Sequence, residues 1–360
     1  MKTLVRLLFI FSLLLLQFAC DSVEPNNNDS EIDTTSHNFA WQSWTFGEHS
    51  SSTLNDVAII NDSSIWAVGE IYLNDSLGQP DPHPYGLVHW NGNEWEVKRI
   101  TAQNPSGGYS YIIPTGILVI NPTEIWLARG GVFLFNGNNI TQAYWLVNYS
   151  GYNGGIFNNG ETAQKLWGKS STDLYAVGNN GAMAYYNGVD WQKIESGTEF
   201  NIYDIYGQKK NNGEYEIICV ASDLFLNHGK KIFKIENNNV TVIPDEGLSN
   251  SIHSVWFVPE TKYFVGGDGL FSTTSLSENW TRHTELPSYY KDAIRGNSLN
   301  DIIVVGAFGI LLHYNGNSWK NFQDITYING ALGRVDIKGN VVCTVGYNDN
   351  KAIVIIGKRN

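Results

Sequence analysis

Short apolar runs of four or five residues recur along the chain at intervals of about 40 to 60 residues. The clearest copies are Ile65–Gly69 (Ile-Trp-Ala-Val-Gly) and Leu174–Gly178 (Leu-Tyr-Ala-Val-Gly). Weaker copies end at Arg129, Ala221, Gly266, Gly306 and Gly346. A run of this length, rich in β-branched and aromatic residues, predicts a buried strand. Seven copies at this period are typical of the blades of a β-propeller.

Each repeat divides into four short strands. In the third copy these are Lys165–Gly168, Leu174–Gly178, Ala182–Tyr186 and a strand at Trp191. An Asn-Gly pair joins the last two strands, and the same pair recurs in other copies at Asn91-Gly92, Asn136-Gly137 and Asn315-Gly316. We predict type I′ hairpins at these pairs, because that turn needs positive φ at both central residues.

The last repeat ends near Gly357 and lacks a fourth strand. A spare strand, Ala40–Phe46, lies at the other end of the chain. Pairing the two would close the ring and remove two exposed sheet edges. The sequence therefore predicts an all-β protein in which residues 38–360 form one seven-bladed β-propeller, closed by the N-terminal strand.

Residues Trp167–Trp191 and Arg295–Trp319 share the motif W-G-x-S-x-x-D-[VIL]-[WY]-A-V-G followed by [HY]-[YW]-N-G-x-x-W, with Arg295 in place of the first Trp. This motif resembles the blade repeat of exported bacterial β-propeller repeat proteins. The resemblance implies a propeller that is often lipid-anchored and whose function is largely unknown, so it supports the fold without naming a ligand.

The first residues resemble an export signal. Lys2 and Arg6 precede the run Leu7–Leu16, which is apolar except at Ser12 and is too short to span a membrane. Ala19 then precedes Cys20, an order that resembles the lipobox of bacterial lipoproteins, although Gln17 stands where Leu is usual. We expect residues 1–19 to be a lipoprotein signal peptide and Cys20 to carry lipid such as palmitate; the alternative is an ordinary secretory signal with an incidental Cys. Residues 20–37 are polar and predict a flexible tether.

This signal predicts a bacterial cell-envelope protein, lipid-anchored at the outer membrane or cell surface and touching the membrane through its anchor only. The chain has 23 basic and 35 acidic residues, a formal charge of −12, which argues against nucleic acid as a partner. Cys219 and Cys343 lie in apolar runs in different repeats, so we expect buried free thiols. No cofactor is expected, with a structural calcium ion in the channel left open.

Three insertions place aromatic residues on one sector of one face. These are Glu70–Tyr85, Thr101–Pro114 and Thr141–Thr162, in blades one to three. Aromatic side chains among Gly, Ser and Asn are typical of surfaces that bind sugars or proteins. The candidate ligand-binding residues there are Tyr109, Tyr111, Tyr144, Trp145, Tyr149 and Tyr152. The alternative is that these rings fold inward and hold the long loops against the blades.

A second set of candidates comes from aligning the innermost strands. Four carboxylates fall in equivalent places and would line the channel: Asp56, Asp204, Asp292 and Asp336. One step nearer the mouth lie Tyr203 and His253. The carboxylates could bind a cation or supply the acid and base of a glycosidase. Alternatively, each accepts hydrogen bonds from backbone N–H groups.

Together these observations favour a monomeric, non-enzymatic envelope lipoprotein that binds a glycan or a protein partner through its aromatic-rich loops. Tyr111, Trp145 and Tyr152 would be the anchors. One alternative is a carbohydrate-active hydrolase that uses two of the four channel-mouth Asp residues. The other is a structural assembly factor for another envelope protein.

Overall fold

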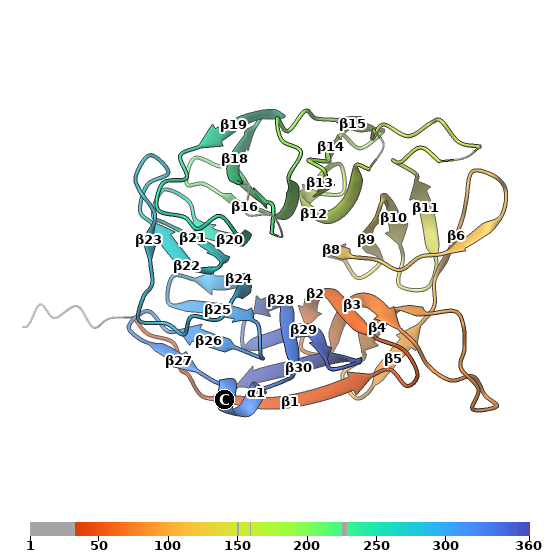
Figure 1. Cartoon of the computed structure of the whole chain (residues 1–360), viewed down its shortest axis with the longest axis horizontal. Helices are drawn as coiled ribbons and strands as arrows, with labels where there is room; N and C mark the ends of the chain where they lie inside the picture. Colours follow the sequence, from red (N-terminus) through yellow and green to blue (C-terminus); the bar gives the residue numbers. More distant parts are fainter. Residues whose placement is uncertain (1–32, 150, 159, 225–228) are drawn as a thin grey trace, which may run out of the picture. The chain divides into compact units, whose positions relative to one another are not determined.

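The structure is a computed structural model that describes residues 33–149, 151–158, 160–224 and 229–360 (Figure 1). The predicted signal peptide, the lipidation of Cys20 and most of the predicted tether lie outside these residues. Asp33–Asn360 form one compact unit. This unit is all-β, with seven four-stranded antiparallel sheets arranged as the blades of a propeller. The predicted fold class is confirmed.

Each blade begins with an inner strand, which lies beside the inner strands of its two neighbours, so that the ring closes around the axis. Blades one to three consist of β2 (Thr53–Asn61), β3 (Ser64–Ile71), β4 (Tyr85–Trp90) and β5 (Trp95–Lys98); β8 (Gly116–Asn121), β9 (Glu124–Arg129), β10 (Gly131–Phe135) and β11 (Ile140–Tyr144); and β12 (Thr162–Ser170), β13 (Asp173–Asn179), β14 (Met183–Tyr186) and β15 (Trp191–Lys193). A separate hairpin of β6 (Thr101–Gln103) and β7 (Tyr109–Tyr111) lies between blades one and two.

Blades four to six consist of β16 (Asn201–Lys209), β17 (Tyr215–Ser222), β18 (Lys230–Glu236) and β19 (Asn239–Ile243); β20 (Ile252–Val258), β21 (Lys262–Gly267), β22 (Gly269–Thr273) and β23 (Thr281–Arg282); and β24 (Lys291–Ser298), β25 (Asp301–Gly306), β26 (Leu311–Tyr314) and β27 (Trp319–Asn321). Blade seven consists of β28 (Gly330–Lys338), β29 (Val341–Asn348), β30 (Lys351–Arg359) and β1 (Phe39–Phe46). The short helix α1 (Gln323–Thr326) precedes blade seven.

The N-terminal strand completes the last blade, as the sequence predicts. β1 pairs with β30 antiparallel over its whole length, from Phe39 opposite Arg359 to Phe46 opposite Ala352. Asp33 and Thr35, which the sequence assigns to the tether, contact blade six: the Asn300 amide donates to Asp33, and the Thr35 N–H donates to the Asn315 carbonyl.

The predicted turn type at the Asn-Gly pairs is wrong. In each pair only the glycine has positive φ, between 91° and 96°, and none of the four asparagines does. The loops are four residues long, and the Asn side chain accepts the N–H groups two and three residues ahead, as Asn187 does from Val189 and Asp190. The asparagine is therefore selected for its side-chain oxygen rather than for a left-handed backbone.

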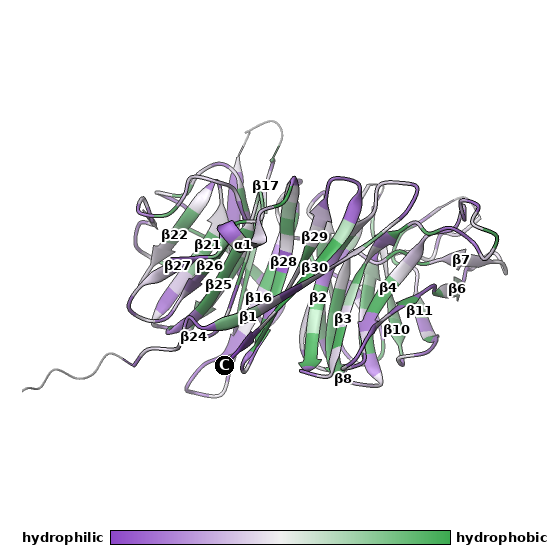
Figure 2. Cartoon of the chain, turned by 90° about the horizontal axis from the view of Figure 1, so that it is seen from below, coloured by the Kyte–Doolittle hydropathy of each residue, from purple (hydrophilic) through white to green (hydrophobic). Residues whose placement is uncertain are grey.

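The core lies between neighbouring blades, where apolar faces of adjacent sheets meet in seven clusters. Seen from the side, apolar residues alternate with polar ones along the strands, and polar residues gather at the loops (Figure 2). Cys219 and Cys343 are buried free thiols in blades four and seven, as predicted, and burial raises the pKa of both. Within the described ranges, no helix has the length and apolar character needed to cross a bilayer.

Candidate functional site: the upper face and the channel mouth

The loops between second and third strands and the connections between blades open on one side of the ring, which we call the upper face. Hydrogen bonds join the two kinds of loop there. The Phe308 N–H in a 2–3 loop donates to the carbonyl of Gly330, where the connection enters β28, at 2.7 Å. In blade three, the Gly181 N–H donates in the same way to Phe200.

A β-bulge interrupts the inner strand near the upper face in six blades. In each, the ladder with the second strand skips one residue, which places that residue at the mouth of the channel: Asn55, Gln164, Tyr203, His253, Asp292 and Gly333. The residues that follow form the next layer down: Asp56, Lys165, Asp204, Ser254, Ala293 and Arg334.

The observed strand pairing corrects the predicted alignment of the four carboxylates. Asp56 and Asp204 are equivalent, as predicted. Asp292 is itself the bulged residue, so it lies one step higher, beside Tyr203 and His253. Asp336 lies two residues further down its strand than the equivalent position, which Arg334 occupies. The carboxylates therefore lie at three different levels. The bulge is not the cause, because it occurs at the same place in each of these blades: the residue equivalent to Asp56 is Ala293 in blade six and Arg334 in blade seven.

Asp56 is held by a buried ion pair. Its two oxygens both lie 2.7 Å from the Lys165 ammonium, and one accepts the N–H of Ile117 in the next blade. Both side chains are buried. Burial lowers the pKa of Lys165, and the Asp56 carboxylate opposes this effect.

Asp204 has more charged and hydrogen-bonding partners than Asp56. Arg295 binds it with two nitrogens, at 2.9 and 2.8 Å, and Ser254 donates its hydroxyl at 2.7 Å. The N–H groups of Val255 and Ile205 also donate to it. Burial alone would raise the pKa of Asp204, but the Arg295 guanidinium outweighs it and holds that pKa well below the usual range.

Asp336 accepts the N–H of Ile59 in blade one, at 2.7 Å, and that of Ile337 on its own strand. Three of the four carboxylates thus accept backbone N–H groups, including one from the next blade in every case. This is the structural arrangement that the sequence left open as an alternative. A carboxylate engaged in this way is poorly placed to exchange protons with a substrate, so the geometry gives the hydrolase hypothesis no support.

Charged residues of the channel line a cavity of about 230 Å³: Asp56, Lys165, Arg295 and Asp336. Among the residues that the structure describes, no group of three or more His, Cys, Asp or Glu is placed to hold a metal ion.

At the channel mouth, Tyr203 and His253 lie against each other, with ring centroids 4.7 Å apart. The His253 Nδ1–H donates to the backbone carbonyl of Asp292 at 2.7 Å, and Arg334 donates to the carbonyl of Tyr203. Burial, reinforced by Arg334, lowers the pKa of His253 to about 3, so the ring is neutral at physiological pH. Burial raises the pKa of Asp292 to about 7 against the opposing effect of Arg334. The structure therefore brings together Tyr203 and His253, as predicted, and adds Asp292 and Arg334.

Most of the aromatic residues predicted in the insertions of blades one to three contact the protein itself. Trp145 lies edge-on to the buried Phe133, and its indole N–H donates to the carbonyl of Gln103. The hydroxyl of Tyr152 donates to the carbonyl of Trp145. Tyr149 lies 5.4 Å from Tyr152, and each accepts the backbone N–H of the other.

Tyr144 is also turned inward, with its hydroxyl 3.0 Å from that of Tyr186 in blade three. Two of the predicted residues on the β6–β7 hairpin are exposed: Tyr109 at 74%, and Tyr111 at 42%, although the Tyr111 ring also lies 4.6 Å from that of His83. The set of candidates is thus divided, and among them only Tyr109 and Tyr111 on this hairpin are exposed.

Exposed apolar side chains are concentrated on the upper face. The described residues include nine large hydrophobic side chains that are exposed. Seven belong to upper-face loops or adjoin them: Leu77, Tyr109, Tyr111, Tyr289, Phe308, Tyr327 and Tyr347. Only Val189 and Val242 lie elsewhere. Since isolated exposed apolar residues would scatter over a surface, this clustering indicates an interaction face.

Four of the seven form what we call the aromatic patch, over blades six and seven: Tyr289, Phe308, Tyr327 and Tyr347. The rings of Tyr289 and Phe308 are 5.5 Å apart. Tyr289 and Tyr327 line one open cavity of about 580 Å³ together with Asn321, Gln323 and Asp324. These four residues are not among those predicted from the sequence.

Phe308 has an unusual backbone. It has φ +55° and is followed by Gly309 with φ +70°, and the Ile310 N–H donates to the Ala307 carbonyl. This is the pattern of a type I′ turn, whose first central position favours Asn, Asp or Gly over a bulky residue. Phe308 is nevertheless 47% exposed, so the packing of its ring offsets only part of the backbone strain at this turn.

Blade three shows what the repeat uses at this place. Asn180 and Gly181 form the same turn, with φ +52° and +72°, and the Ala182 N–H donates to the Asn179 carbonyl. A Cβ added to either glycine would lie within 2 Å of an equivalent carbonyl, Thr198 in blade three or Thr326 in blade six. The replacement of Asn180 by Phe308 can be read from the sequence, because the two repeats align. Its meaning becomes clear only when the left-handed conformation of the turn is known.

Comparisons with known proteins define the class of the fold. No family model matches the sequence, and no curated protein matches it. Among solved structures, the chain is similar to one described as YCF48 bound to a D1 peptide, with 15% identity, 91% of this chain and 100% of that chain covered, and a TM-score of 0.62.

It is also similar to YCF48 from Cyanidioschyzon merolae, with 12% identity, coverage of 89% and 98%, and a TM-score of 0.58. The WD40 propeller domain of Doa1 matches with 10% identity, coverage of 89% and 97%, and a TM-score of 0.57. At these identities the likeness establishes the seven-bladed propeller and nothing finer.

Proposed function

We propose that this protein is a non-enzymatic binding module that takes a protein partner on its upper face. The aromatic patch supplies the anchoring contacts, with the β6–β7 hairpin as a second contact. The observation that carries the proposal is Phe308, an exposed aromatic side chain held at a left-handed turn position where the same repeat elsewhere uses Asn. Aromatic anchors of this kind dominate the binding energy of protein interfaces.

Two further observations support a protein rather than another ligand. The patch is broad and open rather than enclosed, as expected of a protein-binding face. One similar structure is described as bound to a peptide, and another is a WD40 domain. The channel mouth adjoins the patch, because Tyr289 is followed by Tyr290 and Asp292, so a bound segment that reached inward would meet Tyr203 and His253.

Site-specific photo-crosslinking tests the proposal in cells that produce the full chain. A photoreactive benzoyl-phenylalanine replaces Phe308 or Tyr289, and Val189 provides a matched control because it is 72% exposed in a 3–4 turn of blade three, away from the upper face. We expect the same discrete protein adduct from positions 308 and 289 and none from position 189. The purified partner should then bind Phe308→Asn at least tenfold more weakly than the wild type.

Absence of an adduct at positions 308 and 289, or equal labelling at position 189, would refute this proposal. Retention on a polysaccharide that is lost in Phe308→Asn would instead assign the patch to a glycan.

We also propose that the module is presented at the bacterial envelope through lipid on Cys20, on the strength of the N-terminal sequence. Labelling with an alkyne-bearing fatty acid should mark the wild type and leave Cys20→Ser unmarked. Equal labelling of both would contradict lipidation at this residue.

A further inference from the structure

Two turns of blade four differ from their counterparts in the other blades, and both lie on the face opposite the upper face, which we call the lower face. The turn between first and second strands has two or three residues in the other six blades and five, Lys210–Glu214, in blade four. The turn between third and fourth strands contains only Asn237 and Asn238, with φ +50° and +64°, in place of the four-residue Asn-Gly turn of four other blades. Two consecutive left-handed residues make this a type I′ turn, in which Asn is favoured.

The two turns form one side of a cavity of about 780 Å³, and blade three, the neighbour of blade four in the ring (Figure 1), forms the other. The hydroxyl of Tyr175 in blade three donates to the side-chain oxygen of Asn238 at 2.8 Å, so the short turn is tied to the opposite wall. Contacts within the protein therefore hold the cavity in shape before any ligand binds. Other side chains of the lining are Lys169, Asp173, Tyr185, Lys209, Tyr215 and Asn237.

The charged side chains of this lower-face cavity balance one another. The lining contains three lysines and three carboxylates, so it carries no net charge. Two of the lysines have partners within the lining: Lys169 lies 2.7 Å from Asp173, and the Lys210 ammonium lies 3.1 Å from Glu214. A lining of this kind exerts little net attraction on an ion, whereas it offers donors and acceptors to an uncharged polar ligand.

Three polar side chains of the lining have unused hydrogen-bonding capacity. Among the residues that the structure describes, no hydrogen bond or ion pair engages the Tyr215 hydroxyl, the Lys209 ammonium or the Asn237 amide. Two tyrosine rings of the lining, those of Tyr185 and Tyr215, are half-buried. The ring of Tyr215 is held against Trp167, with centroids 5.7 Å apart. The cavity thus combines fixed aromatic rings with polar groups that lack partners.

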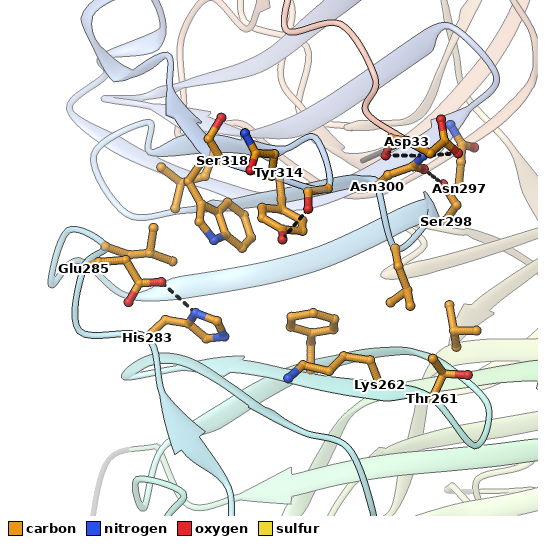
Figure 3. Close-up of a pocket in the computed structure, with 18 of the residues that line it drawn as sticks. Asp33, Thr261, Lys262, His283, Glu285, Asn297, Ser298, Asn300, Tyr314 and Ser318 are labelled. Atoms are coloured by element: carbon orange, nitrogen blue, oxygen red, sulfur yellow. Dashed lines mark hydrogen bonds and ion pairs between the residues drawn. The ribbon is translucent and has the colours of Figure 1, made fainter. Parts of the chain in front are cut away.

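A larger cavity, between blades five and six, has a different character. It measures about 1310 Å³, and its surface is mostly apolar. Its two carboxylates have partners within the protein (Figure 3). Asp33 accepts from the Asn300 amide, and Glu285 accepts from the His283 ring. The surface of the lower-face cavity is mostly polar instead, so this cavity is the one suited to a ligand rich in hydroxyl groups.

We propose that the lower-face cavity between blades three and four is a carbohydrate-binding site for a short, uncharged oligosaccharide. Tyrosine rings provide flat surfaces for the C–H faces of sugar rings, and the amide, phenol and charged groups hydrogen-bond the sugar hydroxyls. The volume suits a ligand of about two or three sugar rings, which is the size of a typical small-molecule ligand. The site lies on the face opposite the aromatic patch and does not depend on the function proposed for that patch.

A glycan array that carries both neutral and acidic oligosaccharides, probed with the purified full chain, tests this inference. We expect retention on neutral oligosaccharides, to the same extent in low and in high salt, because no charge of the ligand is involved. The affinity for a retained oligosaccharide is then measured by isothermal titration calorimetry. It should fall at least tenfold in Tyr215→Ala, which removes a stacking surface, and at least threefold in Asn237→Gly, which removes an amide group. Glycine preserves the turn, because it adopts positive φ freely.

Asn180→Gly is the matched control, because Asn180 is also exposed, has φ +52° and lies in a turn on the upper face, so the affinity should stay unchanged. A urea unfolding midpoint of Asn237→Gly equal to that of the wild type excludes a folding defect. Retention on no glycan, retention on acidic glycans only, or an affinity that survives both cavity variants would overturn the inference. Glycan binding that is lost in Phe308→Asn instead would also overturn it and would assign the glycan to the upper face. If the two cavity variants weaken binding of the crosslinked protein partner and of no glycan, the cavity belongs to a protein interface and the inference is wrong.

Discussion

The turn at Phe308 allows a reciprocal experiment within one molecule. Phe308→Asn gives blade six the residue of blade three, and Asn180→Phe gives blade three the residue of blade six. The two turns share their φ values, their closing hydrogen bond and the carbonyl that crowds the glycine. The side chain is thus the main difference between the two sites.

Two opposing contributions set the change in the free energy of unfolding expected for Phe308→Asn. A bulky residue in the left-handed region is less stable than Asn by about 1 kcal/mol. Against this, the ring of Phe308 is 47% exposed, so it retains roughly half of the 1.5–3 kcal/mol that full burial of such a side chain provides, or about 1 kcal/mol. We therefore expect Phe308→Asn to change the free energy of unfolding by less than about 1 kcal/mol.

Asn180→Phe should differ, because Asn180 is exposed and a ring placed there finds little to pack against. It incurs the backbone strain of about 1 kcal/mol without compensation. Urea unfolding followed by tryptophan fluorescence measures both changes, and Phe308→Gly, which removes the ring and the strain together, completes the comparison. A loss above about 3 kcal/mol in Phe308→Asn would show that the ring belongs to the core and would refute its assignment to an interface.

Four further predictions concern the channel, the thiols and the closure of the ring. Asp204→Asn leaves the buried Arg295 without its charge partner and should lower the free energy of unfolding by about 3–5 kcal/mol in urea titrations; a loss under 1 kcal/mol would contradict the role given to this pair. Burial raises the pKa of Asp292 to about 7 from an unfolded value of about 4, so the stability that its neutral carboxyl group gives is fully present below pH 4 and is lost as pH rises through 7. Asp292→Asn should therefore raise the melting temperature at pH 8 relative to the wild type and leave it unchanged at pH 4. Cys219 and Cys343 should not react with a thiol reagent at pH 8 until the protein unfolds, and rapid labelling of the native protein would contradict their burial. Deleting residues 33–46 exposes the edge of β30 and should produce aggregation in size-exclusion chromatography, whereas a monomer with an unchanged unfolding midpoint would show that β1 is dispensable.

The sequence contains enough information to predict the architecture because propeller blades repeat. The runs at Trp66 and Tyr175 fall on second strands, and the tail at Gly357 needs the strand at Trp41 to complete its blade. Local conformation is harder to predict. Asn-Gly is compatible with several turns, and only the observed φ values show that Asn187 acts through its side chain while Asn180 adopts the left-handed conformation.

The candidate site was predictable only in part, for two physical reasons. Arg295 in blade six and Asp336 in blade seven stand where blade three has Trp167, so no aromatic residue marks the register of these inner strands and the levels of Asp292 and Asp336 were misplaced. Whether a loop aromatic packs or projects depends on the atoms around it, which differ between Trp145 and Tyr109 although both stand in the aromatic-rich insertions. Comparison of the turns at Phe308 and Asn180 needed the structure as well.

The pairing of β1 with β30 makes closure of the ring depend on the last strand of the last blade. β1 is synthesised before every blade, yet its partner β30 is the last strand of the ring to be made. Trp41 and Trp44 therefore have no complete surface to pack on until β30 has been synthesised. A chain that stops early cannot close and leaves an apolar strand available to proteases or to another molecule. Closure of the ring by β1 and β30 thus distinguishes complete molecules from truncated ones, whether or not a partner is bound.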